Sequence, residues 1–189
     1  MIKTLIFVIL QSNILSAYFK VVKSTSQEVI IEFQGPDNFY KMFQTEDGSV
    51  AILDGEELLY KEPGAPYIPF FRIPIALDFR GKYTVDMTIM DKQQILLKLA
   101  GLPEYQDDGL SLRFKKITSK GSFPPKNLVY ADTTYIQRGT PYANLHFSPY
   151  IYNTATGILT YIKKARFRVI REANSTPVKT GKWDIQFPR

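Results

Sequence analysis

Two runs of alternating side chains, separated by a turn, dominate residues Gly139–Val169. In Ala143–Phe147 small or apolar residues alternate with polar ones, and the same period of two returns in Lys164–Val169. Between them lies a stretch rich in Asn and Thr that ends at Gly157. This pattern predicts a β-hairpin with one buried face, and it predicts positive φ at Gly157 in a turn longer than two residues. Because Pro149 cannot donate to a β-ladder, the first strand should end near it.

Short apolar runs bounded by turn residues recur along the rest of the chain. Val29–Phe33 is followed by a Gly-Pro-Asp-Asn turn, and Thr45–Gly48 separates two further runs as the turn of a second hairpin. Residues Tyr83–Ile89 alternate, which predicts a strand with its odd-numbered side chains inside. Gln93–Leu99 is compatible with another strand or with a short helical turn. No stretch has the pattern of an amphipathic helix of two or more turns.

Prolines exclude an α-helix from Glu62–Leu77, because each one removes an amide donor and clashes with the preceding turn. The prolines of this segment are Pro63, Pro66, Pro69 and Pro74. Dense Phe, Ile and Leu favour a buried extended segment along a sheet edge over a polyproline ligand. The chain also holds 13 Phe and 12 Tyr, which suit pleated, half-buried surfaces. We therefore expect an all-β fold, a single-domain antiparallel β-sandwich of jelly-roll-like type with about eight to ten short strands.

The two ends of the chain differ from its middle. Residues 1–17 have a charged start, a short apolar core and a small-residue end at Ser16-Ala17, as a secretory signal peptide has. The apolar core is too short to span a bilayer. The alternative is a first β-strand. We expect a sandwich domain over residues 18–171, a polar linker over residues 172–189, and a secreted or cell-envelope protein without a membrane span.

The composition argues against most catalytic chemistry. The 189 residues include no Cys and one His, which excludes disulfides, thiolate metal sites and a cysteine nucleophile in this chain. His146 alternates with apolar neighbours, so we expect an outward-facing strand residue with no second ligand beside it. The formal charge of +6 comes from scattered Lys and Arg, which favours a solvated basic face over a nucleic-acid site. No glycine-rich phosphate motif is present, so we expect no cofactor.

The least regular stretch runs from Pro103 to Pro125. Long irregular loops on a rigid scaffold often carry function. Asp107 and Asp108 in this loop could bind Ca²⁺, but adjacent loop acids are more often part of a turn, so we expect no metal site.

Five segments together resemble the propeptides of gingipain-type cysteine peptidases. Gly64–Leu77 contains a G-x-P-x-x-P pattern, and Gln137–Gly139, Pro149–Asn153 and Gly157–Tyr161 look like that family's run of R-G, P-x-x-Y-N and L-x-x-Y. Phe123–Pro125 stands where that family has an aromatic-Pro start to the preceding strand. The resemblance covers about residues 60–170, and it is the order of the motifs that makes it specific.

The resemblance implies a non-catalytic prodomain of a secreted cysteine peptidase. Such prodomains are antiparallel β-sandwiches that assist folding of the peptidase and occlude its active site until they are cleaved off. The partner implied is the peptidase catalytic domain, in the same chain or as a separate one.

The resemblance also implies that a basic side chain from an irregular loop enters the specificity pocket of the peptidase. That loop corresponds here to Pro103–Ser122, and its candidates are Arg113, Lys115, Lys116 and Lys120. Arg113 is favoured over Lys120, because a guanidinium pairs most selectively with an acidic pocket.

Other interpretations remain open at this stage. All four basic residues can be ordinary solvated loop residues. The main alternative function is a secreted β-sandwich module that binds a cell-surface glycan or protein through exposed aromatic side chains. A sandwich hydrolase ranks lowest.

Overall fold

A computed structural model of the chain describes the greater part of the sandwich domain. The described residues are 18–45, 48–55, 57–58, 64–77, 79–80, 82–105, 112–124, 127–132, 135–137, 139–172 and 176–177. The proposed signal peptide, residues 1–17, and the acid pair Asp107-Asp108 lie outside them.

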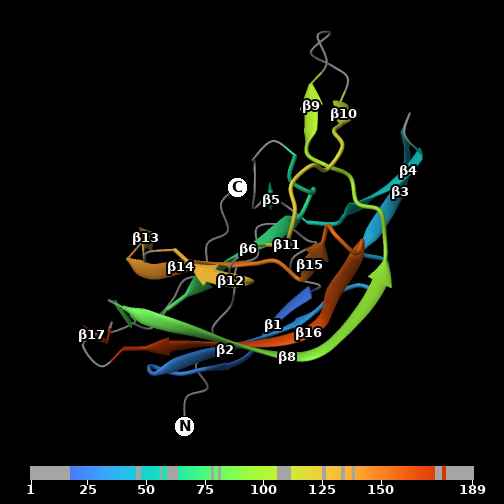
Figure 1. The fold of residues 1–189 in the computed structure, drawn as a ribbon. Helices are drawn as coiled ribbons and strands as arrows, with labels where there is room; N and C mark the ends of the chain where they lie inside the picture. Colours follow the sequence, from blue (N-terminus) through green and yellow to red (C-terminus); the bar gives the residue numbers. More distant parts are fainter. Residues whose placement is uncertain are drawn as a thin grey trace.

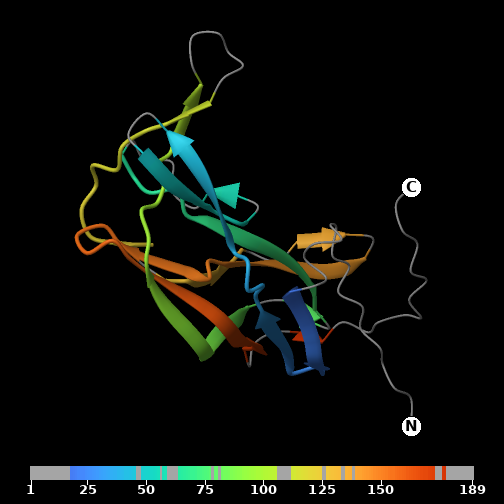
Figure 2. The ribbon, with the colours of Figure 1, turned by 90° about the vertical axis from the view of Figure 1, so that its right-hand side faces the viewer.

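Two antiparallel sheets form the body (Figures 1 and 2). The first sheet has the order β1 (Phe19–Ser24), β2 (Glu28–Gln34), β16 (Ile158–Arg171), β15 (Tyr150–Asn153) and β11 (Ser122–Phe123), and β8 (Tyr83–Leu96) pairs with β16 along its whole length. The second sheet has the order β12 (Val129–Ala131), β14 (Thr140–Phe147), β6 (Pro69–Ala76) and β5 (Glu57–Leu58), with β13 (Tyr135–Gln137) also on β14.

Three short strand pairs complete the described structure. They are β3 (Tyr40–Thr45) with β4 (Gly48–Leu53), β9 (Pro103–Tyr105) with β10 (Leu112–Phe114), and β7 (Phe79–Arg80) with β17 (Thr176–Pro177). All strand pairs are antiparallel, and no helix occurs among the strands and loops just described. The expected all-β antiparallel sandwich is therefore confirmed.

The main core lies between the inner faces of the two sheets. Phe147 of β14 packs against Phe167 of β16, with ring centroids 4.8 Å apart, and against Phe33 of β2 at 5.0 Å. All three rings are buried. Edge-on contacts of this kind stabilise a core beyond the area that they bury.

A second core of aromatic rings lies where β15 and β16 meet the chain before β3. Phe39 stacks on Tyr161 with ring centroids 3.8 Å apart. The Tyr150 hydroxyl donates to the Asp54 carbonyl oxygen at 2.8 Å, and the Tyr161 hydroxyl donates to the Pro36 carbonyl oxygen at 2.9 Å. Burial raises the pKa of both tyrosines, so they remain donors at neutral pH.

The predicted hairpin over Gly139–Val169 is corrected in one respect. Strands β14 and β16 do not pair, because the chain changes sheets at Ser148-Pro149, where the Ser148 hydroxyl donates to the Pro69 carbonyl oxygen at 3.1 Å. The hairpin consists of β15 and β16. The two alternating runs instead face each other across the core, since both have buried inward residues.

The turn of this hairpin has the expected chemistry. The Asn153 side-chain oxygen accepts hydrogen bonds from the amides of Ala155 (2.9 Å) and Thr156 (3.3 Å). Gly157 has φ +68° and its amide donates to the Asn153 carbonyl oxygen at 2.8 Å. The positive φ predicted at Gly157 and the end of β14 before Pro149 are both confirmed.

The other strand predictions have mixed outcomes. The Thr45–Gly48 hairpin is confirmed as β3 and β4. In the described part of the chain β6 pairs with β14 on one side and, at Pro69 and Phe70, with β5 on the other, so the Pro-rich segment runs along an edge beyond these two residues. The alternation of β8 holds as far as Met87, but Ile89 is exposed rather than inside, and the register against β16 shifts directly after it. Residues 93–96 continue the same strand.

The domain boundaries after residue 17 and after residue 171 stay predictions. Within the predicted linker, Thr176 and Pro177 pair with β7. A search of the described residues for a helix with the length and apolar character to cross a bilayer found none.

The core assignment predicts unequal costs for the same substitution in two strands. Ile73 of β6 is 0% exposed and Ile136 of β13 is 56% exposed. Ile73→Ala should lower the free energy of unfolding by about 2–5 kcal/mol, whereas Ile136→Ala should change it by about 0.5 kcal/mol or less. Urea unfolding followed by tyrosine and tryptophan fluorescence measures both. Equal costs would contradict the assignment of β6 to the core.

Candidate functional site

The hairpin of β9 and β10 projects from one end of the molecule, and we call these two strands the arm (Figures 1 and 2). Leu112 pairs with Tyr105, and Phe114 pairs with Pro103. The arm occupies the stretch that was expected to be irregular, so part of that loop is an ordered ribbon. A two-stranded ribbon has little core of its own and depends on what holds its base.

A ladder of main-chain hydrogen bonds holds the base of the arm. The Lys115 amide donates to the Leu102 carbonyl oxygen at 3.2 Å, which closes the hairpin below β9 and β10. The Leu102 amide donates in turn to the Ala65 carbonyl oxygen at 3.2 Å, and the Tyr67 amide donates to the Ala100 carbonyl oxygen at 2.8 Å. The Pro-rich segment before β6 therefore lies directly against the chain that enters the arm.

Two glycines allow these segments to approach so closely. Gly64 has φ +81°, and its carbonyl oxygen accepts the amides of Thr118 and Ser119, both at 3.0 Å. A β-carbon on Gly101 would lie 2.2 Å from the Lys115 carbonyl oxygen, a distance that two such atoms cannot adopt. Glycine is thus favoured at residue 64 by the positive φ, and at residue 101 because there is no space for a β-carbon.

The G-x-P-x-x-P pattern has a structural role at this base. Gly64 anchors the chain that leaves the arm, and Pro66 forms an antiparallel bridge with Gly101. Pro69 begins β6 and packs against Gly55, where a β-carbon would lie 2.4 Å from the proline ring. The pattern therefore connects the arm to the second sheet.

The four basic candidates lie on the arm or on the chain that leaves it. Arg113 is in β10, opposite Glu104 of β9. Lys115 and Lys116 follow directly, and both are exposed. Lys120 is also exposed, but it lies four residues beyond Lys116, so the structure brings only the first three to the arm.

Lys120 differs because the chain on both sides of it is bound to the body. Ser119 bonds to Gly64 on one side. On the other side the Gly121 amide donates to the Thr154 hydroxyl, and the Thr154 amide donates to the Gly121 carbonyl oxygen, both at 3.0 Å. A side chain at Lys120 thus starts from the body rather than from a projecting ribbon.

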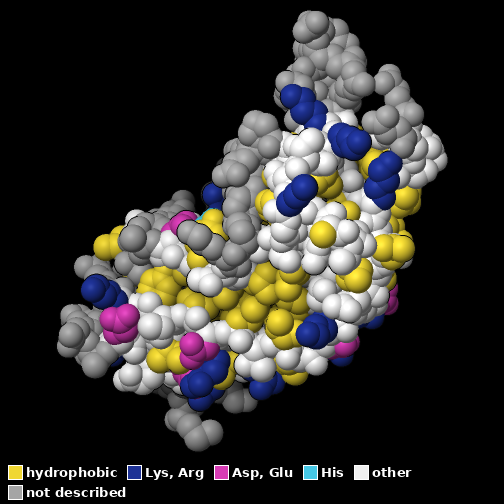
Figure 3. Space-filling view, in the orientation of Figure 1, with side chains coloured by type: hydrophobic (Ala, Val, Ile, Leu, Met, Phe, Trp, Pro, Cys, Tyr) yellow, Lys and Arg dark blue, Asp and Glu magenta, His cyan; other side chains and the backbone are white. Residues whose placement is uncertain are grey.

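On one face of the molecule, the charged side chains described near the arm are basic (Figure 3). Figure 3 shows Lys and Arg side chains spaced over the upper part of this face, near the arm, with no acidic side chain between them among the coloured residues. A basic surface of this kind attracts an acidic partner and speeds the encounter with it.

The arm also contacts the neighbouring β3–β4 hairpin. The Phe114 ring lies 6.3 Å from the Phe43 ring of β3 and 6.4 Å from the Tyr67 ring. Sequence reasoning had assigned Met42 and Phe43 no role. Their adjacency in the sequence could have predicted an exposed apolar side chain. Two consecutive strand residues point to opposite faces, and a hairpin has only one face to bury.

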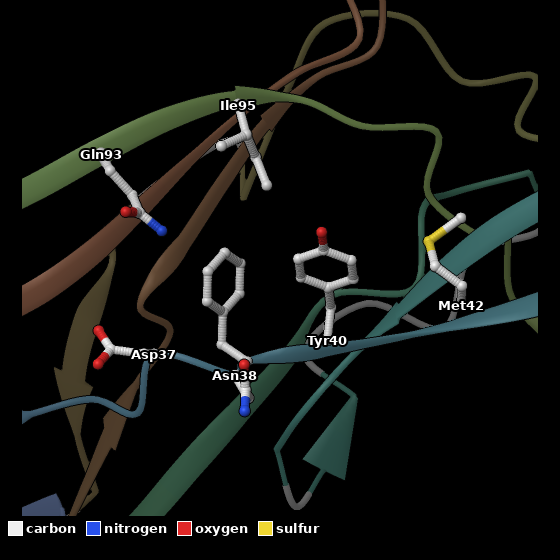
Figure 4. A pocket seen from close by; sticks show the side chains of 7 residues that line it. Asp37, Asn38, Tyr40, Met42, Gln93 and Ile95 are labelled. Carbon is white, nitrogen blue, oxygen red and sulfur yellow. The ribbon is translucent and has the colours of Figure 1, made fainter.

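A depression of about 410 Å³ lies beside β3 (Figure 4). Tyr40 and Met42 line it from β3, and Gln93 and Ile95 line it from β8. Its one carboxylate, Asp37, is 3.0 Å from the Lys163 ammonium group. Among the described residues no group of three His, Cys, Asp or Glu side chains could hold a metal ion. The depression therefore offers no second acid, nucleophile or ligand set.

Few aromatic rings face solvent in the described structure. Of the Phe and Tyr residues whose side chains the structure describes, Phe43 and Tyr130 are the strongly exposed ones, and they lie in different sheets. A flat aromatic platform for a glycan is therefore not formed by them.

His146 lies away from the arm and, contrary to expectation, is buried. Its side chain points away from the main core, but Tyr130 stacks on it at 4.5 Å with the rings 3° from parallel, which leaves it 7% exposed. The ring donates from Nε2 to the Asp132 carboxylate at 2.9 Å, since an ionised carboxylate can only accept. Within the described structure its Nδ1 atom has no hydrogen-bond partner.

The similarity of this chain to known proteins is found in its structure. No protein-family model and no curated protein sequence matches this chain. One similar solved structure is the complex of the pro- and mature domains of RgpB from Porphyromonas gingivalis, with a TM-score of 0.64 and 14% identity over 88% of this chain and 91% of that chain. Another is a structure on the zymogenic latency of gingipain K from Porphyromonas gingivalis, with a TM-score of 0.58 and 18% identity over 80% and 90%.

The chain has the fold found in these gingipain structures. The likeness spans most of both chains in each comparison, so it covers the sandwich as a whole. The resemblance to gingipain-type propeptides that the motifs indicated is confirmed in the fold. The choice of inhibitory residue is not tested by it and stays a prediction.

The arm base predicts a specific effect of Gly101→Ala. The added methyl group must displace the Lys115 carbonyl, which should cost about 1–3 kcal/mol and open the base. Hydrogen exchange should then show lost protection at the amides of Lys115 and Leu102. Gly139→Ala is the matched control, because Gly139 has φ +82° but open space around it. If both variants leave these amides equally protected, the base does not depend on Gly101.

The Asp132–His146 pair predicts a pH dependence of stability. Burial raises the pKa of Asp132. The hydrogen bonds from His146 and Asn144 act in the opposite direction and help to outweigh burial, so the pKa lies below its ordinary value. The carboxylate therefore stabilises the fold above the unfolded-state pKa, and this contribution is lost as the pH falls through the folded-state value. Asp132→Asn should be less stable than the wild type at pH 7, and the difference should shrink below about pH 5. Urea unfolding at several pH values measures it, and a constant difference would contradict the pair.

Proposed function

We propose that this chain is the non-catalytic propeptide domain of a secreted gingipain-like cysteine peptidase, and that it blocks the active site until it is removed by proteolysis. The observation that carries the proposal is the fold, which matches chains of two gingipain structures described by their pro-domain and by zymogenic latency. The ordered arm and its basic residues support the same role.

The arm supplies the geometry that an inhibitor needs. A ribbon that projects from a rigid body can enter a cleft that the body cannot, and the glycine-dependent base holds it at one orientation. Such preorganisation lowers the entropy that binding costs. A basic residue on the ribbon then pairs with an acidic specificity pocket by charge-assisted hydrogen bonds.

Arg113 is the best placed of the four candidates. It is the only one within a strand of the arm, whereas Lys115 and Lys116 lie at its base and Lys120 is flanked by bonds to the body. A guanidinium can bind a carboxylate through two hydrogen bonds, which an ammonium group cannot reproduce.

The remaining roles follow from this assignment. A domain that binds the folded peptidase but not the unfolded chain stabilises it by mass action, which is the basis of a folding aid. The peptidase is the partner, and the proposed signal peptide places both in a secreted or cell-envelope compartment.

Inhibition by the purified chain tests the proposal. The chain should inhibit an Arg- or Lys-specific cysteine peptidase of gingipain type at nanomolar concentration. Arg113→Ala should weaken inhibition about 100-fold or more, because loss of a buried charged anchor costs about 2–5 kcal/mol. Lys116→Ala is the control and should change it by less than about threefold.

Two results would count against the proposal. Absence of both inhibition and complex formation on gel filtration would remove the propeptide role. Inhibition that survives Arg113→Ala but is lost on Lys120→Ala would keep the role and move the inhibitory residue to the body.

A further inference from the structure

Two adjacent apolar side chains of β3 face solvent on opposite sides of the strand. Met42 is 53% exposed and Phe43 is 43% exposed. Their neighbours Lys41 and Gln44 are exposed as well, so four consecutive residues of β3 have little cover. We call Lys41–Gln44 the β3 edge.

The β3 edge is a strand edge as well as an exposed surface. Among the described residues β3 pairs only with β4, and its other side carries no strand. Natural proteins usually shield such edges with charges, bulges or a covering segment. Here Met42 and Phe43 stand at the middle of the edge instead, with an even register to β4 and no bulge.

The edge is continuous with the arm. The Phe43 ring contacts the Phe114 ring at the end of β10, and β3 and β9–β10 lie at the same end of the molecule in both views (Figures 1 and 2). A partner that takes the arm into a cleft must therefore lie next to the β3 edge.

The charges around the edge select the kind of partner. The described residues of β3, β4, the arm, 97–102 and 115–124 include one acidic residue, Glu104 of β9. Their basic residues are Lys41, Lys98, Arg113, Lys115, Lys116 and Lys120. A second copy of this chain would bring the same positive charge to the contact, which disfavours self-association.

We propose that the β3 edge is a second docking surface for the peptidase, where Met42 and Phe43, on opposite sides of the strand, each pack against apolar surface of the peptidase that has an acidic rim. This inference rests on the proposed function and extends it from the arm to the body. Aromatic and Met side chains are enriched at the centres of such contacts, and a central apolar anchor usually dominates the affinity. The lysines around it act chiefly on the association rate.

The test compares exposed apolar side chains on the β3 edge with exposed apolar side chains on other strands. Met42→Ser and Phe43→Ser, each alone, should weaken binding to the gingipain-type peptidase about 10- to 100-fold, mainly through faster dissociation. Val22→Ser on β1 and Ile136→Ser on β13 are the controls, because both side chains are exposed and lie in other strands. Phe43→Leu should restore binding to within about threefold, since it keeps an apolar side chain.

The measurements separate docking from damage to the arm. Association and dissociation rates are measured on the immobilised peptidase at low and high salt, and hydrogen exchange at the Lys115 amide reports on the arm base. Met42→Ser keeps the test decisive even if Phe43→Ser loosens the arm through Phe114. A Lys41→Ala variant should slow association at low salt and have little effect at high salt.

Each outcome decides one question. If the wild type neither binds nor inhibits, the proposed function fails. If the wild type binds and both Ser variants bind like the controls, the β3 edge does not dock. Loss of binding to anionic lipid vesicles in the same variants, with unchanged peptidase binding, would assign the edge to a membrane surface and overturn the inference.

Discussion

The packing of β14 against β2 and β16 is the contact on which the rest of this structure depends. Phe147 lies between Phe33 and Phe167, and all three rings are fully enclosed. β2 and β16 belong to the first sheet and β14 to the second, so the rings hold the two layers together. The change of sheet at Ser148-Pro149 makes this possible, because it brings two consecutive segments of the chain face to face rather than side by side.

The arm is attached to this body by main-chain hydrogen bonds and close backbone contacts rather than by a hydrophobic core of its own. Its base needs a residue with positive φ at Gly64 and has no space for a β-carbon at Gly101, and the Phe114 ring contacts Tyr67 and Phe43. The position of the ribbon therefore depends on the backbone geometry at its base.

The chain shares its fold with gingipain structures at only 14% and 18% sequence identity, so the fold fixes the residue type at few positions. A β-sandwich tolerates exchange among apolar residues provided that volume and pattern are kept. Narrow requirements are seen at positions such as Gly64, Gly101 and Gly157, where a positive φ or a close approach excludes most side chains. Ordered short motifs can therefore indicate a fold when overall identity does not.

The sequence by itself determined the features that are local. Alternation in residues 143–147 and 164–169, the turn at Gly157 and the extended Pro-rich segment follow from side-chain period and backbone restriction within a few residues. Only the tertiary structure decided which strands pair, why His146 is buried beneath Tyr130, and that Gly64 and Phe43 meet the arm. These contacts join residues far apart in the chain, and their geometry depends on the whole fold, which no local pattern encodes.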